Sequence, residues 1–324
     1  MLDILKLIST AKCYEEVRTM RWSSGVTCPK CNTTNIKRYG SHKGEKERRC
    51  YLCKSCGCRF DDLTGTIYEG SHLPLKTWVL CSYLMALNLS NSQISKELEI
   101  TEKTAQSITT ILRESVVKKK ERAVLEEEVE LDEVYVVAGQ KGQPKKVKER
   151  KRSSRRNRLK GKRGRGTMKD EKNPILGMIQ RSGKLVLKML PDVKIETIKP
   201  IISKVIKVGS TTYTDEYVIY HKMNEWGYKH KTVNHGSGEY ARDEDKDGFH
   251  EIHVNTQEGC WSLLRSWLRP HRGISQSKLP FYLGFFEFIH NAKKRGASIM
   301  HELMLCLLSL DKRTVEEFLD FEYI

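Results

Sequence analysis

The chain carries a strand-like run at residues 129–137, which reads Val129-Glu130-Leu131-Asp132-Glu133-Val134-Tyr135-Val136-Val137. Its β-branched and aromatic residues predict a β-strand. Asp132 lies in the middle of that strand, where a buried carboxylate costs free energy unless something pairs with it. Strand-like and helix-like runs alternate from here to about residue 234, so we predict an α/β domain. We expect Asp132 to be part of a functional site in that domain.

Two further acids follow the same pattern. Asp215 closes the run Thr211-Thr212-Tyr213-Thr214-Asp215, and Glu258 opens a predicted helix. Three carboxylates brought together by a fold suit Mg²⁺ or Mn²⁺. Two such ions, about 3.5–4 Å apart, can activate a water or a 3′-hydroxyl on one side of a phosphate and stabilise the leaving oxygen on the other. Arg265 follows Glu258 by seven residues, on about the same helix face, where a guanidinium would meet the phosphate. Each acid alone is more often a turn residue or a helix cap.

Length and charge narrow the classes of protein. A chain of 324 residues predicts one medium domain with smaller modules. It has 58 Lys and Arg against 41 Asp and Glu, which gives a net charge of +17. This excess predicts a polyanionic partner, and nucleic acid is the first candidate. The alternative is a basic protein with a well-solvated surface.

The sequence predicts neither membrane insertion nor secretion. No run approaches the roughly 18 apolar residues of a membrane span, and Met1-Leu2-Asp3 lacks the basic start of a secretory signal. We therefore expect a reducing compartment, the nucleoid-containing cytoplasm of a prokaryote or the nucleus of a eukaryote. In such a compartment we expect the ten cysteines to be metal ligands or buried thiols rather than disulfides.

Residues 26–60 contain two CxxC pairs, Cys28-Pro29-Lys30-Cys31 and Cys53-Lys54-Ser55-Cys56. Each pair aims two thiolates at one point, and two pairs supply the tetrahedral sulfur set of a structural Zn²⁺. Bound zinc would supply folding free energy that this short segment lacks. Free or redox-active thiols are the alternative. Cys50 and Cys58 lie close in sequence, but Gly57 after Cys56 favours the second pair as written.

Helical periodicity runs from about residue 76 to 122, with breaks near 88–91 and 99–101. The pattern from 89 to 108 predicts a helix, a tight turn and a second helix, with Ser92 and Thr101 as N-caps. Lys103 and Thr104 fall early on the exposed face of the second helix, where a helix-turn-helix would contact the major groove. An ordinary helical hairpin is the alternative.

The segment 141–169 is rich in Lys, Arg, Gly and Ser and cannot build a core of its own, so we predict a loop inside the larger domain. Its residues 141–165 hold fourteen Lys and Arg and one acid. We interpret this loop as an arm that follows the phosphates of DNA, unless it is merely a solvated surface loop. The residues proposed to contact DNA are Lys145, Lys146, Arg155 and Arg156.

These features predict five parts. They are an N-terminal helix and linker at 1–25, a zinc ribbon at 26–60, a helical DNA-binding region at 61–125, a catalytic domain at 126–295 and a C-terminal helix at 296–324.

The linked motifs resemble the DDE transposases of insertion sequences, in particular the zinc-ribbon group related to Merlin elements. The resemblance covers about residues 26–291. Besides the CxxC pairs, the matching residues are Arg59-Phe60, Gly65-Thr66, Pro74-Leu75-Lys76-Thr77-Trp78, Glu130-Leu131-Asp132-Glu133, Tyr213-Thr214-Asp215-Glu216 and residues 253–265.

The resemblance implies an RNase H-like catalytic domain with a mixed sheet, preceded by the zinc ribbon and the helix-turn-helix. It implies that Asp132, Asp215 and Glu258 bind Mg²⁺ or Mn²⁺, and that Arg265 stands where such enzymes carry a basic residue. Some members use Asn in place of the third acid, so Asn255 is the alternative to Glu258. Glu133 points to the opposite strand face from Asp132 and is expected to be non-catalytic.

The implied activity is that of a transposase. It would bind the terminal inverted repeats of its element as double-stranded DNA, cleave at the element ends and join the 3′-OH ends to target DNA, as a homodimer or a larger assembly. A nuclease of the same fold and a zinc-dependent DNA-binding regulator without activity are the alternatives. Trp261 is expected to pack in the core, and Asn291, which also matches the family, has no role derivable from the sequence.

Overall fold

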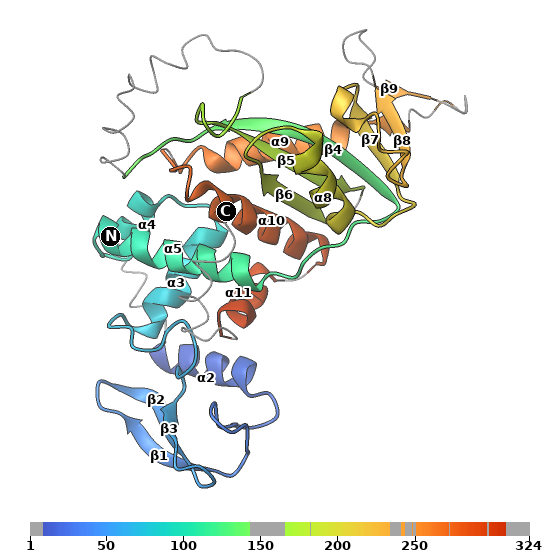
Figure 1. Cartoon of the computed structure of the whole chain (residues 1–324). Helices are drawn as coiled ribbons and strands as arrows, with labels where there is room; N and C mark the ends of the chain where they lie inside the picture. The colour runs from blue at the N-terminus through green and yellow to red at the C-terminus, as the bar shows by residue number, and fades with distance from the viewer. Residues whose placement is uncertain are drawn as a thin grey trace. The chain divides into compact units, whose positions relative to one another are not determined.

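The computed structural model describes residues 9–142, 166–181, 183–233, 241–243, 248, 251–271, 273–296 and 298–308. The chain forms two compact units (Figure 1). The cysteine unit comprises Met1–Lys120 and Gly296–Ile324, and the sheet unit comprises Glu121–Arg295. Most of the predicted basic loop, including Lys145, Lys146, Arg155 and Arg156, falls outside the described residues.

The cysteine unit begins with helix α2 (Thr10–Arg21) and an antiparallel sheet of β1 (Ile36–His42), β2 (Glu45–Cys53) and β3 (Arg59–Asp61). One face of this sheet holds a small aromatic core, in which Tyr51 stacks on Phe60 with ring centroids 5.3 Å apart and Trp22 meets both rings edge-on. So small a core explains why the segment needs a further stabilising element.

The other elements of secondary structure in the described part of the cysteine unit are helices. They are α3 (Leu75–Ala86), α4 (Asn91–Glu97), α5 (Glu102–Lys119) and α11 (Ile299–Leu308), and α11 packs against α2, α3 and α5. The two predicted breaks in helical periodicity are present between α3 and α4 and between α4 and α5. Among the described helices, the last one, α11, is therefore part of the same unit as the first one, α2.

The helix caps agree with the sequence prediction at one position and differ at the other. Thr101 caps α5, since its Oγ1 accepts a hydrogen bond from the Thr104 N–H at 3.1 Å. The prediction that Ser92 caps α4 is wrong, because Ser90 does so. Ser90 Oγ accepts from Gln93 N–H at 3.3 Å while Gln93 Oε1 accepts from Ser90 N–H at 2.9 Å, a reciprocal capping box that starts the helix two residues earlier.

The sheet unit has a mixed sheet, as predicted, and the structure gives it five strands in the order β6-β5-β4-β7-β8. Its central strand β4 is antiparallel to β5 and parallel to β7. The strands are β4 (Glu128–Val137), β5 (Lys172–Gln180), β6 (Leu185–Met189), β7 (Thr211–Asp215) and β8 (Lys229–Val233). The short helix η1 (Val218–Tyr220) follows β7, and β9 (Ala241–Arg242) pairs with β10 (Ile252–His253).

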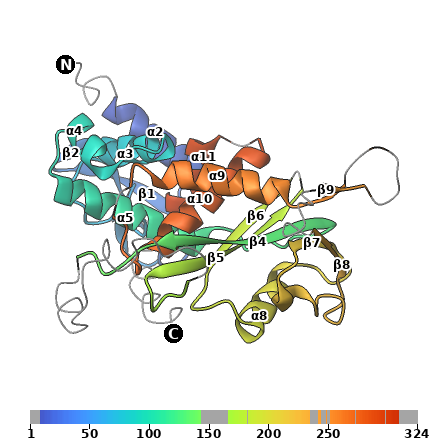
Figure 2. The same cartoon turned by 90° about the horizontal axis from the view of Figure 1, so that it is seen from above.

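Helices cover both faces of this sheet (Figure 2). Helix α8 (Ile195–Val205) covers one face, and α9 (Asn255–Leu268) and α10 (Leu279–Lys294) cover the other. The alternation of side chains along β4 explains the two cores. Val129 and Leu131 pack with Ile198 and Ile202 of α8, whereas Val134 packs with apolar residues of α9 and α10. Asp132 therefore points to the α9 side.

The edge strand β6 is held by side chains of α10. Asn291 donates from Nδ2 to the Leu185 carbonyl at 2.9 Å and accepts from the Leu185 N–H at 2.7 Å. Buried Glu287 accepts from the Leu187 N–H at 3.1 Å. These bonds satisfy backbone groups that an edge strand would otherwise leave unpaired. The two hydrogen bonds to Leu185 give Asn291 a structural role, which could not be derived from the sequence.

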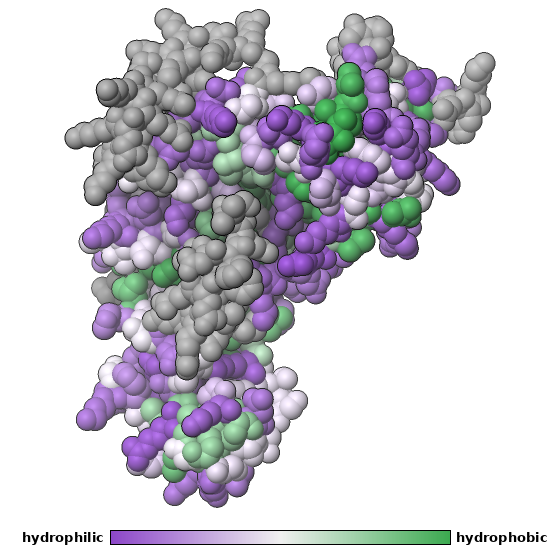
Figure 3. Space-filling view, in the orientation of Figure 1, coloured by the Kyte–Doolittle hydropathy of each residue, from purple (hydrophilic) through white to green (hydrophobic). Residues whose placement is uncertain are grey.

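Hydrophilic residues dominate the visible surface in Figure 3, with hydrophobic residues in small scattered patches. Within the described part of the chain, no helix combines the length and the apolar character needed to cross a membrane.

Candidate active site

The structure brings the elements that carry the three predicted acids together. Asp132 lies within β4, Asp215 ends the neighbouring parallel strand β7, and Glu258 lies near the start of α9. The pairing of β4 with β7 runs from Glu128 and Thr211 to Glu130 and Tyr213, so Asp132 and Asp215 each lie two residues beyond the last pair. Because adjacent strands lie about 4.8 Å apart, Asp132 and Asp215 lie in the same region of the sheet, where β7 ends.

Asp132 has the most constrained environment of the three. Its Oδ2 accepts a hydrogen bond from Nε1 of Trp261 at 2.8 Å, and its Oδ1 accepts from the Glu133 N–H at 2.7 Å. Burial raises the pKa of Asp132 to about 6, these two hydrogen bonds oppose the rise, and the charges of Asp215 and Glu258 add to it. The three carboxylates are thus close enough to repel one another.

The neighbouring acid Glu133 faces the other side of the sheet, as expected from strand alternation. The hydroxyl of the fully buried Tyr220 donates a hydrogen bond to Glu133. The pKa of Tyr220 is raised well above its usual value by burial, then by Glu133, Asp132 and Asp215. Negative charge therefore accumulates at this end of the sheet.

Helix α9 approaches the sheet closely because residue 177 is glycine. Gly177 pairs with Asp132 across β4 and β5. A Cβ atom there would lie 2.7 Å from Cζ2 of Trp261 and closer still to Nε2 of Gln257, both side chains of α9. The absence of a side chain at Gly177 leaves room for the indole of Trp261, whose Nε1 reaches Asp132. A glycine inside an apolar strand often marks a site where another element approaches the backbone closely. Gly177 could therefore have predicted that a helix packs closely against this strand.

We expect Gly177→Ala to destabilise the sheet unit by about 1–3 kcal/mol, because the added methyl group must displace Trp261 or Gln257. The matched control is Gly259→Ala in α9 itself, where nothing lies within 4 Å of the added Cβ atom. That change should stabilise by up to about 1 kcal/mol, since alanine is the better helix former. Urea unfolding of both variants tests the difference, and equal free energies of unfolding would contradict it.

The face of α9 that carries Glu258 is open to solvent. Glu258, Ser262 and Arg265 are exposed, whereas Trp261 is buried. Arg265 thus shares a face with Glu258, as the seven-residue spacing predicts. Asn255, the alternative third residue, is exposed at the first position of α9. The role of Trp261 as a partner of Asp132 was missed, because the sequence indicated only core packing.

The acidic group fits a divalent cation by its chemistry. Its donors are carboxylate oxygens, the ligands that Mg²⁺ and Mn²⁺ prefer. Burial raises the pKa of Asp132 most and the charges of Asp215 and Glu258 add to the rise, and a bound cation would counteract both effects. Among the described residues, however, these acids do not form a group with ligand atoms within 4.8 Å of one another, as the cysteines do.

The stability of the metal-free protein should depend on pH through Asp132. Its pKa is about 6 in the folded chain against an ordinary 3.8. The folded state binds this proton more tightly, so the free energy of unfolding should fall as pH rises from about 4 to about 6. Asp132→Asn removes the effect, and its melting temperature relative to wild type should therefore increase between pH 4.5 and 7. A difference that is constant with pH would contradict the prediction.

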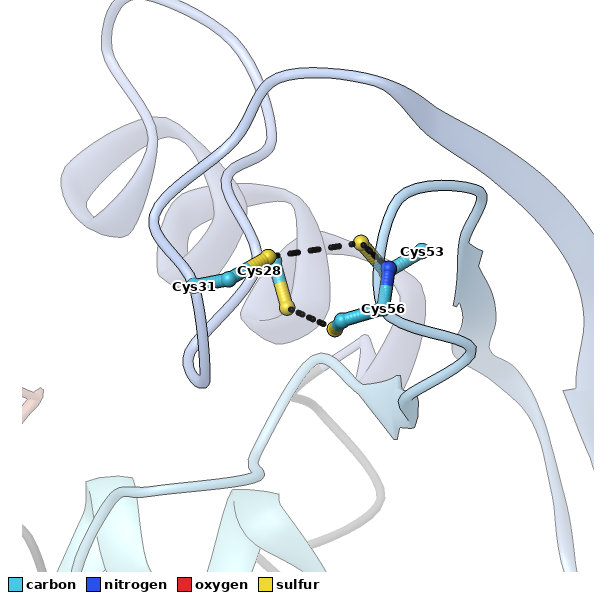
Figure 4. Close-up of side chains that lie close together, drawn as sticks. All are labelled: Cys28, Cys31, Cys53 and Cys56. Atoms are coloured by element: carbon cyan, nitrogen blue, oxygen red, sulfur yellow. Dashed lines mark hydrogen bonds between the residues drawn. The ribbon is translucent and has the colours of Figure 1, made fainter.

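The four predicted zinc ligands form a compact cluster in the cysteine unit (Figure 4). Sγ of Cys28 lies 3.7 Å from that of Cys56, and Sγ of Cys31 lies 3.6 Å from that of Cys53. Tetrahedral sulfurs about 2.3 Å from one Zn²⁺ would be about 3.8 Å apart. The N–H groups of Lys30 and Cys56 point at Sγ of Cys28 and Cys53, each at 3.4 Å, and would stabilise thiolates there.

The predicted DNA-contacting residues of α5 lie in its first turn. Lys103 is exposed, and Thr104 is half-buried with its hydroxyl 2.8 Å from that of Thr101. Lys103 is free to meet a partner, whereas Thr104 takes part in the helix cap.

Comparison with known proteins identifies the family. Residues 124–291 match the model of the ISXO2-like transposase domain. The chain belongs to the ISXO2-like transposase family. A relative in this comparison is an uncharacterized protein in transposable element ISH50 of Halobacterium salinarum (strain ATCC 700922 / JCM 11081 / NRC-1). It is 34% identical over 291 residues, which are 89% of this chain and 92% of the relative.

A solved structure, described as the cryoEM structure of simian T-cell lymphotropic virus intasome in complex with PP2A regulatory subunit B56 gamma, matches 64% of this chain and 67% of its own. The identity is 11% and the TM-score is 0.28, too low to carry an argument. Membership of the ISXO2-like transposase family implies a DNA-cleaving enzyme with DNA as its partner. It agrees with the resemblance drawn from the sequence.

Proposed function

We propose that this protein is a DDE-type transposase that binds the terminal inverted repeats of its insertion sequence, cleaves DNA at the element ends and joins the 3′-OH ends to target DNA. The observation that most supports the proposal is the placement of the three acids: Asp132 lies on the central strand β4, Asp215 ends the neighbouring strand β7, and Glu258 lies near the start of α9. The charges of Asp215 and Glu258 add to the burial that raises the pKa of Asp132. A mixed sheet with helices on both faces and acids on its central strands supports an RNase H-like fold.

In this mechanism Asp132, Asp215 and Glu258 would hold two Mg²⁺ or Mn²⁺ ions. Bound there, the ions would supply activation of the attacking hydroxyl and stabilisation of the leaving oxygen. The indole N–H of Trp261 orients the Asp132 carboxylate. Exposed Arg265 would contact the phosphate beside the reacting bond. Water attacks in the first step and the new 3′-hydroxyl in the second, both in line at phosphorus, with no covalent protein–DNA intermediate.

Glu258 is the better supported third ligand. Its charge contributes to the raised pKa of Asp132, which requires proximity. Glu258→Gln should therefore reduce cleavage far more than Asn255→Ala. The reverse order in a cleavage assay would assign the role to Asn255.

We infer that the cysteine unit recognises the element ends. The helices α4 and α5, joined by a tight turn, support a helix-turn-helix whose exposed Lys103 faces DNA. The exposed face of the small sheet adds a basic and aromatic surface, where Arg59 lies over the Tyr39 ring at 4.7 Å. Lys37 and Arg59 are both exposed and flank Leu52 across the three strands. Such side chains suit a phosphate backbone. The four cysteines would bind a structural Zn²⁺ that holds this surface together.

The test is an Mg²⁺-dependent assay on the DNA that flanks the gene. We expect nicking at the element ends, and joining to a plasmid when a pre-cut end is supplied. Cleavage without joining would identify a nuclease of the same fold, and binding without cleavage would identify a regulator. Because two ends must be joined to one target, we expect a dimer or larger assembly on DNA. Its mass can be measured by light scattering.

A further inference from the structure

The sheet unit contains a buried ion pair that the proposed chemistry does not use. Glu130 of β4 is fully buried, and its Oε1 accepts a hydrogen bond from Nε of Arg181 at 2.9 Å. Arg181, which directly follows β5, is 15% exposed. A buried ion pair seldom stabilises a fold more than apolar residues of the same size would. Its presence therefore calls for a reason other than stability.

Glu130 supplies the N-terminal cap that α9 lacks. The N-cap residue of α9 is Val254, whose side chain makes no capping bond. Instead, Oε2 of Glu130 accepts from the Gln257 N–H at 2.9 Å, and Oε1 accepts from the Thr256 hydroxyl at 2.9 Å. A carboxylate at a helix N-terminus satisfies unpaired N–H groups and the helix dipole together. The strand that carries Asp132 thus fixes the start of the helix that carries Glu258.

Arg181 extends the same network to the third element. Its guanidinium carbon lies 3.9 Å from the centroid of the Tyr213 ring in β7, and its Nη2 donates to the His253 carbonyl at 3.0 Å. The Tyr213 hydroxyl donates to Glu128 at 2.5 Å, and Arg181 Nη1 also contacts Glu128, at 3.4 Å. One guanidinium therefore touches β4, β7 and the residues just before α9.

The contact points are close in sequence to the acids. Glu130 lies two residues before Asp132, and Tyr213 lies two residues before Asp215, so in each strand both side chains point to the same face. Gln257 directly precedes Glu258. A displacement of any one element would change the spacing of the three carboxylates.

We propose that Glu130 and Arg181 are positioning residues that set the spacing of Asp132, Asp215 and Glu258 for divalent cations. This inference rests on the proposed function, because it assumes that those acids bind metal. Some residues do not touch the metal but form hydrogen bonds that orient its ligands. Replacing such a residue typically lowers metal affinity or activity about 10- to 100-fold. Glu130 and Arg181 touch no substrate in this scheme and act through the ligands.

The experiment measures Mn²⁺ binding to the full-length, zinc-loaded chain by electron paramagnetic resonance, without DNA. Glu130→Gln keeps the shape of the side chain and removes its charge, and it should raise the Kd for Mn²⁺ about 10- to 100-fold. Thr256→Val removes one bond to Glu130 and keeps the ion pair. It should raise the Kd by a smaller factor. Cleavage of an element end should recover in both variants at high Mn²⁺ concentration.

Two controls separate positioning from stability. Glu126→Gln makes the same chemical change at an exposed ion pair with Lys207 in the same unit, and it should leave the Kd unchanged. Asn291→Ala removes the two bonds to β6, lowers the melting temperature and should also leave the Kd unchanged.

Folded Glu130→Gln and Thr256→Val proteins that bind Mn²⁺ as tightly as wild type would overturn the inference. If Glu130→Gln does not fold, Thr256→Val decides alone, and an unchanged Kd overturns it. Wild-type binding that is lost in Asp132→Asn but intact in both variants overturns this inference and leaves the proposed function standing. A wild-type protein that binds no Mn²⁺ would overturn both.

Discussion

Replacing Asp132 with Asn should reduce DNA cleavage and joining by at least about 10⁴-fold, the loss seen when a member of a catalytic group is removed. Asn has nearly the same size and can keep one of the two hydrogen bonds that Asp132 accepts, from Trp261 or from the Glu133 N–H, so the variant loses the negative charge and one acceptor. Asp215→Asn should have the same effect, because Asp215 ends the strand next to that of Asp132 and its charge adds to the raised pKa of Asp132. Cleavage and strand transfer on labelled element ends measure both steps.

Binding and stability provide the controls for these variants. The cysteine unit, which we propose to recognise DNA, does not contain Asp132 or Asp215, so the Kd for an element end should stay within about twofold of wild type. Near neutral pH the ionised Asp132 is disfavoured by burial and by its acidic neighbours. Removing this charge offsets the one hydrogen bond that the amide loses, so the melting temperature of Asp132→Asn should stay close to that of wild type. Substantial cleavage by either folded variant would refute the proposed site.

Replacing Cys28 or Cys56 with Ser should unfold the small sheet of the cysteine unit. The two sulfurs are 3.7 Å apart in the cluster, and either change leaves three thiolates for a tetrahedral ion. Structural zinc contributes roughly 10–16 kcal/mol in isolated zinc-finger peptides, far more than a core of a few aromatic rings. We expect bound zinc to fall from about one equivalent to near zero, and binding of element ends to weaken by at least about tenfold.

Cys50 and Cys58 are the matched controls, because they lie in the same segment but outside the cluster. Cys50→Ser and Cys58→Ser should retain both zinc and DNA binding. Atomic absorption and fluorescence anisotropy measure the two properties. Zinc retained in Cys28→Ser, or lost in Cys58→Ser, would show that the ligand set is wrong.

Predictions from the sequence succeeded for features that depend on residues close to one another in the chain. Each CxxC pair is a local knuckle, and the structure brings the two pairs together as the motif predicts. The β-branched and aromatic residues around Asp132 predicted a strand, and the break near residues 99–101 predicted the turn before α5. The cap at Ser90 was missed because Ser92 competes with it in sequence, and only the reciprocal bond with Gln93 distinguishes them.

The surroundings of the acids depend on tertiary structure. Trp261 and Asp132 are 129 positions apart, and Glu130 and Gln257 are 127 apart. Asn291 reaches Leu185 across 106 positions. Periodicity reports which face of a strand or helix is buried, but it carries no information about which other element covers that face. Strand order, register and the gap left by Gly177 decide those partners, because hydrogen bonds form only between groups that the packed elements bring within about 3 Å.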